Sequence, residues 1–359
     1  MMQNNQAIPF NKENFKLIFS KEFALVIIIS IPSAIVAEFF NIPLAWFLGP
    51  MLITSLASLM GLKTKMPKLV LSSILILLGL YIGNYIDKSL FSQIHQWAWT
   101  SLIMLIYIVV SVLIVSKYLQ IFSKYKRTTS IFSAAPGALA PLMILAEDEK
   151  SDLSQVATAH LIRLIIIITV FPFIVNSFYD VEGVKIAEEI IKDQNIVHLI
   201  LLIISSIILI IIFDKFRIPA ALLSGTLFAS GFLQISEIAS YQLPPDIIDY
   251  CLLILGASVG CRFADKTFSE IARNALHSFV ATFLLVILGV IAAFAAGLII
   301  DKNFFTLLLS YCPGGIYEVA VIAIFFDLDP EFVSFHHIIR LLMILFIVPI
   351  MLRIIGKKT

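Results

Sequence analysis

Charged side chains are scarce in this chain. Asp, Glu, Lys and Arg make up 14% of its 359 residues, whereas soluble domains carry about 25%. Mean hydropathy is +1.01, and 60% of the residues are hydrophobic. The net charge of +1 gives no attraction to nucleic acid, and no stretch is polar and basic enough to fold as a nucleic-acid-binding module. The composition predicts an integral membrane protein whose partner is the lipid bilayer, not nucleic acid.

Residues that commonly carry enzyme chemistry are also few. The three cysteines, Cys251, Cys261 and Cys312, lie in or beside apolar segments without metal-ligand spacing, which is typical of buried reduced thiols. The six histidines do not form a metal set. The sequence lacks His-Glu-x-x-His, Gly-x-Ser-x-Gly and phosphate-loop motifs. We therefore expect no enzyme activity, with no catalytic residues, no metal and no cofactor.

Long polar stretches are rare, and twelve apolar segments fill most of the chain. Each has about 17–25 residues, the length that a membrane-spanning helix needs. The N-terminal segment, residues 1–21, is too polar for a cleaved signal peptide and is expected to stay in the cytoplasm. The apolar segments are 22–37, 44–61, 69–86, 98–116, 129–147, 153–177, 196–213, 219–235, 247–264, 275–299, 304–326 and 332–354.

The second half of the chain repeats the first. His160-x-x-Arg163 recurs 177 residues later as His337-x-x-Arg340. Chance agreement of such residues in one register is rare, so we infer an internal duplication. We expect membrane repeat 1 at 22–178, a polar linker at 179–195 and membrane repeat 2 at 196–359. Further matching pairs are Gly79 with Gly256, Gly83 with Gly260, Pro136-Gly137 with Pro313-Gly314, and Pro172 with Pro349.

Two topologies are open for the halves. In the first, all twelve segments cross the membrane as helices, two of them kinked at Pro-Gly. Five basic residues of the second half then lie outside: Lys215, Arg217, Arg262, Lys266 and Arg273. In the second, the Pro-Gly segments dip in and return on the same side, and most lysines and arginines lie inside, as the positive-inside rule requires.

The charge distribution favours the second topology. Each half then has five crossing helices and one hairpin, and the odd number of crossings inverts the second half. The predicted fold class is an all-α polytopic membrane protein with two inverted repeats. Each repeat has about five transmembrane helices plus a Pro-Gly re-entrant or broken helix.

Two arginines deep in apolar segments are the strongest candidates for a site. An arginine at the bilayer centre costs roughly 2.5–3.5 kcal/mol, and such residues are usually functional. Arg163 and Arg340 either attract an anionic solute or brace hairpin carbonyls, and both interpretations stay open. The helix breaks add unpaired backbone N–H groups at the starts of half-helices. The predicted substrate-binding residues are Arg163, Arg340, Glu318, Gly137, Gly314, Gly315 and Tyr317.

Three residues are candidates for coupling to H⁺ or Na⁺. His160 and His337 lie one helical turn before the arginines, where they either relay protons or are buried neutral hydrogen-bond donors. Glu318 is a carboxylate in an apolar segment that has no counterpart in the first half. A desolvated carboxylate can exchange a proton or bind a cation. It can equally be an ion-pair partner of an arginine.

Several of these pieces together resemble the AbrB family of duplicated bacterial integral membrane proteins. They are Ile-Pro-Leu-Ala-Trp-Phe-Leu-Gly-Pro at 42–50, the two Pro-Gly segments and the two His-x-x-Arg helices. The first hairpin departs from the family's Pro-Gly-Gly pattern with Pro136-Gly137-Ala138. The resemblance implies a multi-pass protein of the bacterial inner membrane, related to inverted-repeat carriers. It does not extend to the small soluble DNA-binding regulator of the same name.

These observations predict a secondary transporter of a small anionic solute, with a site at the midplane between the repeats. The alternative is a membrane-embedded sensor that regulates gene expression through a partner. A homodimer is also among the expected assemblies. The sequence leaves the substrate open.

Overall fold

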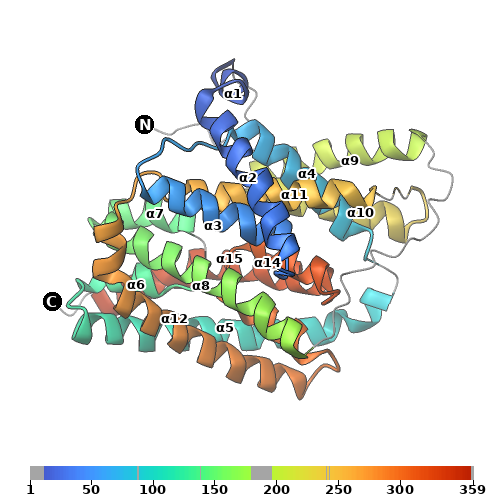
Figure 1. The fold of residues 1–359 in the computed structure, drawn as a ribbon. Coiled ribbons are helices and arrows are strands. Elements are labelled where there is room, and N and C mark those ends of the chain that lie inside the picture. Colours follow the sequence, from blue (N-terminus) through green and yellow to red (C-terminus); the bar gives the residue numbers. More distant parts are fainter. Residues whose placement is uncertain are drawn as a thin grey trace. The chain divides into compact units, whose positions relative to one another are not determined.

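The computed structural model describes residues 12–86, 89–137, 139–178, 196–239, 241 and 243–356 (Figure 1). These residues are helical or lie in short connections, and no strand occurs among them. The predicted polar linker, 179–195, lies outside the described residues. The helices are α1 (Lys12–Ile18), α2 (Lys21–Phe39), α3 (Ala45–Leu59), α4 (Lys68–Gly83), α5 (Ser89–Phe122), α6 (Arg127–Ala134), α7 (Leu139–Asp148), α8 (Leu153–Phe178), α9 (Ile196–Lys215), α10 (Ala221–Ile235), α11 (Pro245–Cys261), α12 (Phe268–Gly297), α13 (Phe304–Tyr311), α14 (Ile316–Phe325) and α15 (Pro330–Gly356).

The predicted all-α membrane class is confirmed. Each apolar segment coincides with one helix, or with two helices where Pro-Gly interrupts it. Among the described residues, six helices are long and apolar enough to cross a membrane. Four others, α3, α4, α10 and α11, have only 15, 16, 15 and 17 residues. They are shorter than the roughly 20 residues that a full crossing takes.

The chain divides into two compact units, each built from both halves of the sequence. Unit 1 is made mainly of α1–α4 and α9–α11, and unit 2 mainly of α5–α8 and α12–α15. The sequence did not predict this division. Hydropathy and internal repeats divide the chain into consecutive halves, whereas each unit combines helices from both halves.

Unit 1 is held together by close helix pairs from different halves. Helix α3 packs against α11, and α10 packs against α4. A Cβ on Gly260 of α11 would lie 2.5 Å from Thr54 Cβ, and one on Gly83 of α4 would lie 2.8 Å from the Leu227 carbonyl oxygen. The Gly-x-x-x-Gly pairs are therefore packing surfaces that allow backbones to approach, as small residues do in membrane helices.

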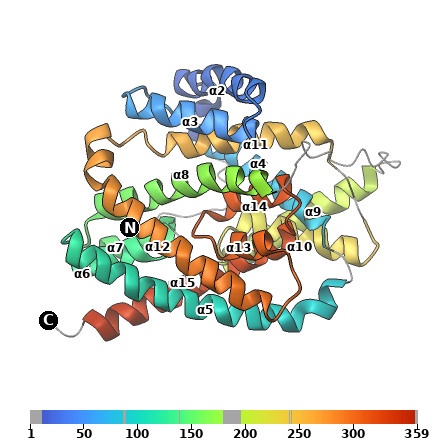
Figure 2. The same ribbon diagram turned by 60° about the horizontal axis from the view of Figure 1, so that its bottom comes forward.

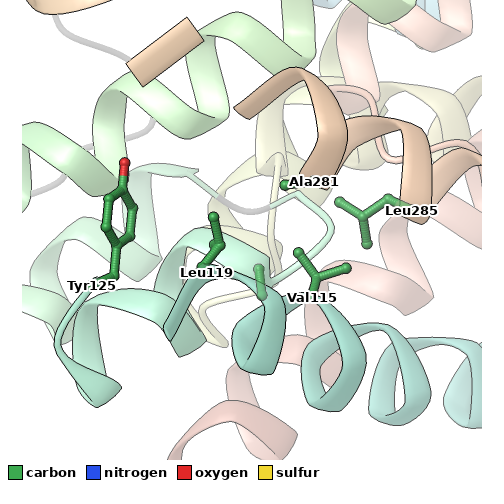
Figure 3. Close-up of a cluster of buried hydrophobic side chains, with 6 residues drawn as sticks. Val115, Leu119, Tyr125, Ala281 and Leu285 are labelled. Atoms are coloured by element: carbon green, nitrogen blue, oxygen red, sulfur yellow. The ribbon is translucent and has the colours of Figure 1, made fainter. Parts of the chain in front are cut away.

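In unit 2, α5 and α12 run antiparallel (Figure 2). The Tyr125 hydroxyl donates to Asn274 Oδ1 at 3.2 Å near one end, and the Tyr107 hydroxyl donates to the Leu285 carbonyl at 3.4 Å farther along. Burial and the nearby Asp152 carboxylate raise the pKa of Tyr125 to about 12, so its phenol stays a neutral donor. Between these contacts an apolar cluster joins α5, α12 and the end of α6 (Figure 3). Its members are Val115, Leu119, Tyr125, Ala134, Ala281 and Leu285.

Proline breaks the helix in both Pro-Gly segments. The preceding residues, Ala135 and Cys312, have ψ values of 128° and 132°, because a proline ring disfavours the helical region for its predecessor. Gly137 has φ +108°, which side-chain-bearing residues rarely adopt. Helices α6 and α13 end at these breaks after eight residues each, or about 12 Å.

Each broken segment is a hairpin whose two ends lie together. The Asp152 backbone N–H, just before α8, donates to Thr129 Oγ1 at the start of α6 at 3.0 Å. The Lys302 ammonium, just before α13, lies 5.5 Å from the ring centroid of Phe332 at the start of α15. We call α6–α7 hairpin 1 and α13–α14 hairpin 2.

The two hairpins open at opposite ends of unit 2. Hairpin 1 opens where the C-terminal end of α5 meets the start of α12, as the Tyr125–Asn274 bond shows. Hairpin 2 opens where α5 begins, since the Trp97 and Phe332 rings lie 5.2 Å apart. Of the two interpretations of the Pro-Gly segments, these contacts match the hairpin.

Candidate functional site

Arg163 and Arg340 are carried near the middle of α8 and α15. They are 2% and 0% exposed. Each lies ten residues after the first residue of its helix, or about 15 Å along the axis, which is half the thickness of a bilayer core. The hairpin tips reach a similar depth, since α6 and α13 are about 12 Å long.

Arg163 holds the tip of hairpin 1. Its Nη1 donates to the Ala135 carbonyl at 2.6 Å, and its Nη2 donates to the Ser133 carbonyl. One turn earlier, His160 Nε2 donates to the Phe132 carbonyl at 3.0 Å. These carbonyls lie at the end of α6, where the helix supplies no N–H donor to them. The two side chains provide the missing hydrogen bonds.

Arg340 holds the tip of hairpin 2 in the same way. Its Nη1 donates to the Cys312 carbonyl, and its Nη2 donates to the Gly314 carbonyl at 2.7 Å. Nη2 also donates to Nδ1 of His337 at 2.9 Å. His337 Nε2 in turn donates to the Leu309 carbonyl at 3.0 Å. The brace that the sequence left as one alternative is therefore present in both halves.

The brace does not use all the guanidinium donors. An arginine has five N–H groups; Arg163 donates two hydrogen bonds and Arg340 three within the described residues. Nε of each arginine is buried and has no hydrogen-bond partner among those residues. Buried donors are normally paired, and leaving one unpaired costs about 1–3 kcal/mol. Two such donors beside two helix breaks indicate a place for an acceptor.

Tyr107 of α5 lies near the two arginines, although no prediction from the sequence included it. Its hydroxyl donates to the Leu285 carbonyl at 3.4 Å. Its ring lies 6.2 Å from the Tyr311 ring of hairpin 2, edge to face. The residue stands in an ordinary apolar helix, and its partners come from other helices. No sequence signal marks it.

Gly137 lies against the arginine of the other repeat. A Cβ at this position would lie 3.1 Å from Nη2 and 3.4 Å from Nε of Arg340. The tip of hairpin 1 and the guanidinium that braces hairpin 2 are therefore neighbours. Gly137, Gly314 and Arg340 thus meet at one place.

Glu318 is 1% exposed and turns back toward the break in its own hairpin. A Cβ on Gly315 would lie 2.9 Å from the Glu318 carboxyl carbon. Since α14 begins at Ile316, Gly315 is its N-cap and Glu318 its third residue, the position of the glutamate in a capping box. Tyr317 is half-buried in the same first turn. Within the described part of the chain, the two guanidinium groups donate to backbone carbonyls and to the His337 ring.

A further buried polar group was also missed. His336 Nδ1 donates to the Phe332 carbonyl at 2.9 Å, and Nε2 lies 2.8 Å from Thr100 Oγ1. The Tyr311 hydroxyl donates to the Thr100 carbonyl at 2.8 Å. These bonds fix the start of α15 and the end of α13 to α5. Within the described ranges, no three His, Cys, Asp or Glu residues gather as a metal site.

The chain is similar to bacterial proteins of comparable length. A relative from Escherichia coli (strain K12) named "Putative regulator AbrB" is 22% identical over 320 residues, covering 88% of this chain and 91% of the relative. The "Uncharacterized protein YhjN" of Bacillus subtilis (strain 168) is 23% identical over 310 residues, covering 79% and 78%. No solved structure matches.

A family model described as "Transition state regulatory protein AbrB" matches residues 2–83 and 46–356, which together span nearly the whole chain. The matched relatives are large proteins, and the matched chain is apolar and helical. The expected resemblance is therefore confirmed. The chain belongs to the AbrB family.

Proposed function

We propose that the chain is a secondary transporter that moves a small anionic solute across the bacterial inner membrane, with its N-terminus in the cytoplasm. One observation carries the proposal: two buried arginines lie at the tips of two hairpins from opposite ends of unit 2, and the Nε–H of each has no hydrogen-bond partner among the described residues. Because each guanidinium already gives part of its donors to carbonyls, the remaining donors are oriented before a ligand arrives.

The donor chemistry favours a carboxylate or a similar oxyanion. Guanidinium groups bind such oxygens through charge-assisted hydrogen bonds, which are about twice as strong as neutral ones. Helices α7 and α14 begin directly after the breaks, and helix starts favour negative charge. Gly137 leaves space beside Nε and Nη2 of Arg340 that a side chain would fill. An oxygen of the solute is the proposed occupant.

The arrangement of the hairpins supports alternating access. Transporters with inverted repeats place broken helices of the two halves around a midplane site. Here each half supplies one hairpin, and the hairpins open at opposite ends of the unit that holds the arginines. Each hairpin is proposed to face one side of the membrane. Glu318 and at least one of the two histidines, His160 and His337, are proposed to couple transport to H⁺ or Na⁺.

Flux measurements on purified protein in liposomes test the proposal. Labelled acetate, lactate, succinate, citrate and phosphate are offered under a pH gradient and under a Na⁺ gradient. We expect gradient-dependent uptake of at least one anion, and its loss in Arg163→Lys and Arg340→Lys, which keep a charge but remove the Nε–H donor. Arg353→Lys is the matched control, because Arg353 is exposed in the last turn of α15.

A second candidate function is a membrane sensor that regulates gene expression through a partner. The word "regulator" in the name of the Escherichia coli relative favours it. A sensor needs the anion site but no flux. Binding of an anion by thermal shift, without uptake under either gradient, would support the sensor and reject the transporter. Neither binding nor uptake for all five anions would reject the anion site itself.

A further inference from the structure

The two related histidines differ in one contact. His337 uses both ring nitrogens: Nε2 donates to the Leu309 carbonyl, and Nδ1 accepts a hydrogen bond from Arg340 Nη2. A carbonyl can only accept and a guanidinium can only donate. The ring of His337 must therefore be neutral, with its single proton on Nε2. A second proton on Nδ1 would face the Arg340 donor.

His160 has only the first of these contacts. Its Nε2 donates to the Phe132 carbonyl, so Nδ1 is the proton-free nitrogen of the neutral ring. Arg163 Nη2 donates to the Ser133 carbonyl, whereas its counterpart in Arg340 bonds to a ring nitrogen. Nδ1 of His160 thus has no hydrogen-bond partner among the described residues. The side chain is 5% exposed, whereas His337 is 0% exposed.

We infer that His160, and not His337, is the proton-binding group of the anion site, and that the proton and the anion bind together. The inference rests on the proposed anion site and deepens it. The proton adds to Nδ1, the bond from Nε2 to Phe132 is retained, and the ring becomes an imidazolium. The second histidine is assigned to the brace of hairpin 2 alone.

Electrostatics explains why the two ligands depend on each other. Arg163 follows His160 by one turn of α8, and α6 faces the ring with the neutral Phe132 carbonyl. In a site of low dielectric, a second positive charge beside Arg163 is unfavourable. An anion held by the Nε–H of Arg163 offsets that repulsion. By linkage, a bound anion strengthens proton binding by the same factor as the proton strengthens anion binding.

Nuclear magnetic resonance of ¹⁵N-histidine-labelled protein in nanodiscs tests the inference directly. His160→Gln and His337→Gln assign the two rings and form a matched pair, because glutamine can still donate to the hairpin carbonyl. The rings are followed between about pH 5 and pH 8, without added anion and with acetate, succinate, citrate or phosphate. We expect the ring of His337 to stay a neutral Nε2–H tautomer throughout. We expect His160 to become an imidazolium as the pH falls, and at a higher pH when one of the anions is present.

The outcomes separate this inference from the proposed transporter. A His160 ring that stays neutral in all conditions, or a His337 ring that titrates, overturns the assignment even if the protein transports an anion. Titration of His160 with anion dependence supports it even if no flux occurs. In liposomes with flux, His160→Gln should lose anion-driven proton movement while the anion still shifts the melting temperature. Retained proton movement in that variant would overturn the inference.

Discussion

Gly137, from the first half of the chain, lies beside the guanidinium group of Arg340 from the second half. A Cβ at Gly137 would approach Nη2 to 3.1 Å, and the residue has φ +108°. Two features therefore favour glycine at this position: the positive φ angle and the guanidinium that a Cβ would crowd. The contact connects the tip of one hairpin to the brace of the other.

Replacing Gly137 tests the contact. Gly137→Ala should strain the backbone by about 1–2 kcal/mol and cover the free edge of Arg340, so that anion binding and uptake are lost. Gly61→Ala is the matched control: Gly61 has φ +86° with nothing within 4 Å of a Cβ. We expect both variants to melt at similarly lower temperatures, but only Gly137→Ala to lose the anion-induced shift. Equal anion responses in the two variants would contradict the prediction.

The brace predicts a large effect of removing a guanidinium. Arg340→Ala leaves the Cys312 and Gly314 carbonyls and His337 Nδ1 without their donor. An unpaired buried polar group costs about 1–3 kcal/mol, so the total loss should exceed about 3 kcal/mol. We expect little folded protein by size-exclusion chromatography and a much lower melting temperature. Arg353→Ala, at an exposed position of the same helix, should behave as the wild type. Normal yield and melting temperature of Arg340→Ala would show that the brace is dispensable.

Local patterns predicted the helices and their breaks, because apolar runs and Pro136 or Pro313 act on the nearest turns. They also supplied the brace as one alternative for Arg163 and Arg340. Local patterns did not show whether the arginines brace the hairpins or bind a ligand, because the partners of a buried arginine come from segments distant in sequence. Each guanidinium donates part of its N–H groups to hairpin carbonyls, and its Nε has no hydrogen-bond partner in the described part of the chain.

Other parts of the site had no local signal. Tyr107, Thr100 and His336 meet their partners on helices far away in sequence. The division into two units was missed for the same reason, since α3 and α11 come from different halves. Glu318 is different. The spacing from Gly315 to Glu318 is that of a capping box. The position of the Glu318 carboxylate beside the N-cap of its helix could therefore have been predicted from the sequence.

The packing of unit 1 predicts sensitivity at its close helix contacts. A Cβ on Gly260 would lie 2.7 Å from Ser55 N and 2.9 Å from the Met51 carbonyl. Since these are backbone atoms, α3 and α11 must separate, and overpacking of this kind costs about 1–3 kcal/mol. Gly260→Ala should lower the melting temperature. Gly297→Ala is the control, because its Cβ would lie 3.5 Å from Leu307 Cδ1, an ordinary contact. If both variants melt like the wild type, the close approach of α3 and α11 is not needed.

The hairpins predict which loops share a side of the membrane. Lys124 precedes hairpin 1 and Lys150 follows it, and both are exposed. Because the Thr129–Asp152 bond brings the two ends of hairpin 1 together, Lys124→Cys and Lys150→Cys should both react from the cytoplasm. Asp301, exposed just before hairpin 2, lies at the other end of unit 2, so Asp301→Cys should react from outside.

The measurement uses a membrane-impermeant maleimide on whole cells and on inverted vesicles. The variants are made in a background in which Cys251, Cys261 and Cys312 are alanine. Reaction of Lys124→Cys and Lys150→Cys from opposite sides would mean that α6 and α7 cross the membrane as one broken helix. With six crossings in the first half, the second half would run parallel to the first, and the predicted inversion would be wrong. The two hairpins would then not face opposite sides, and the alternating-access proposal would lose its structural basis.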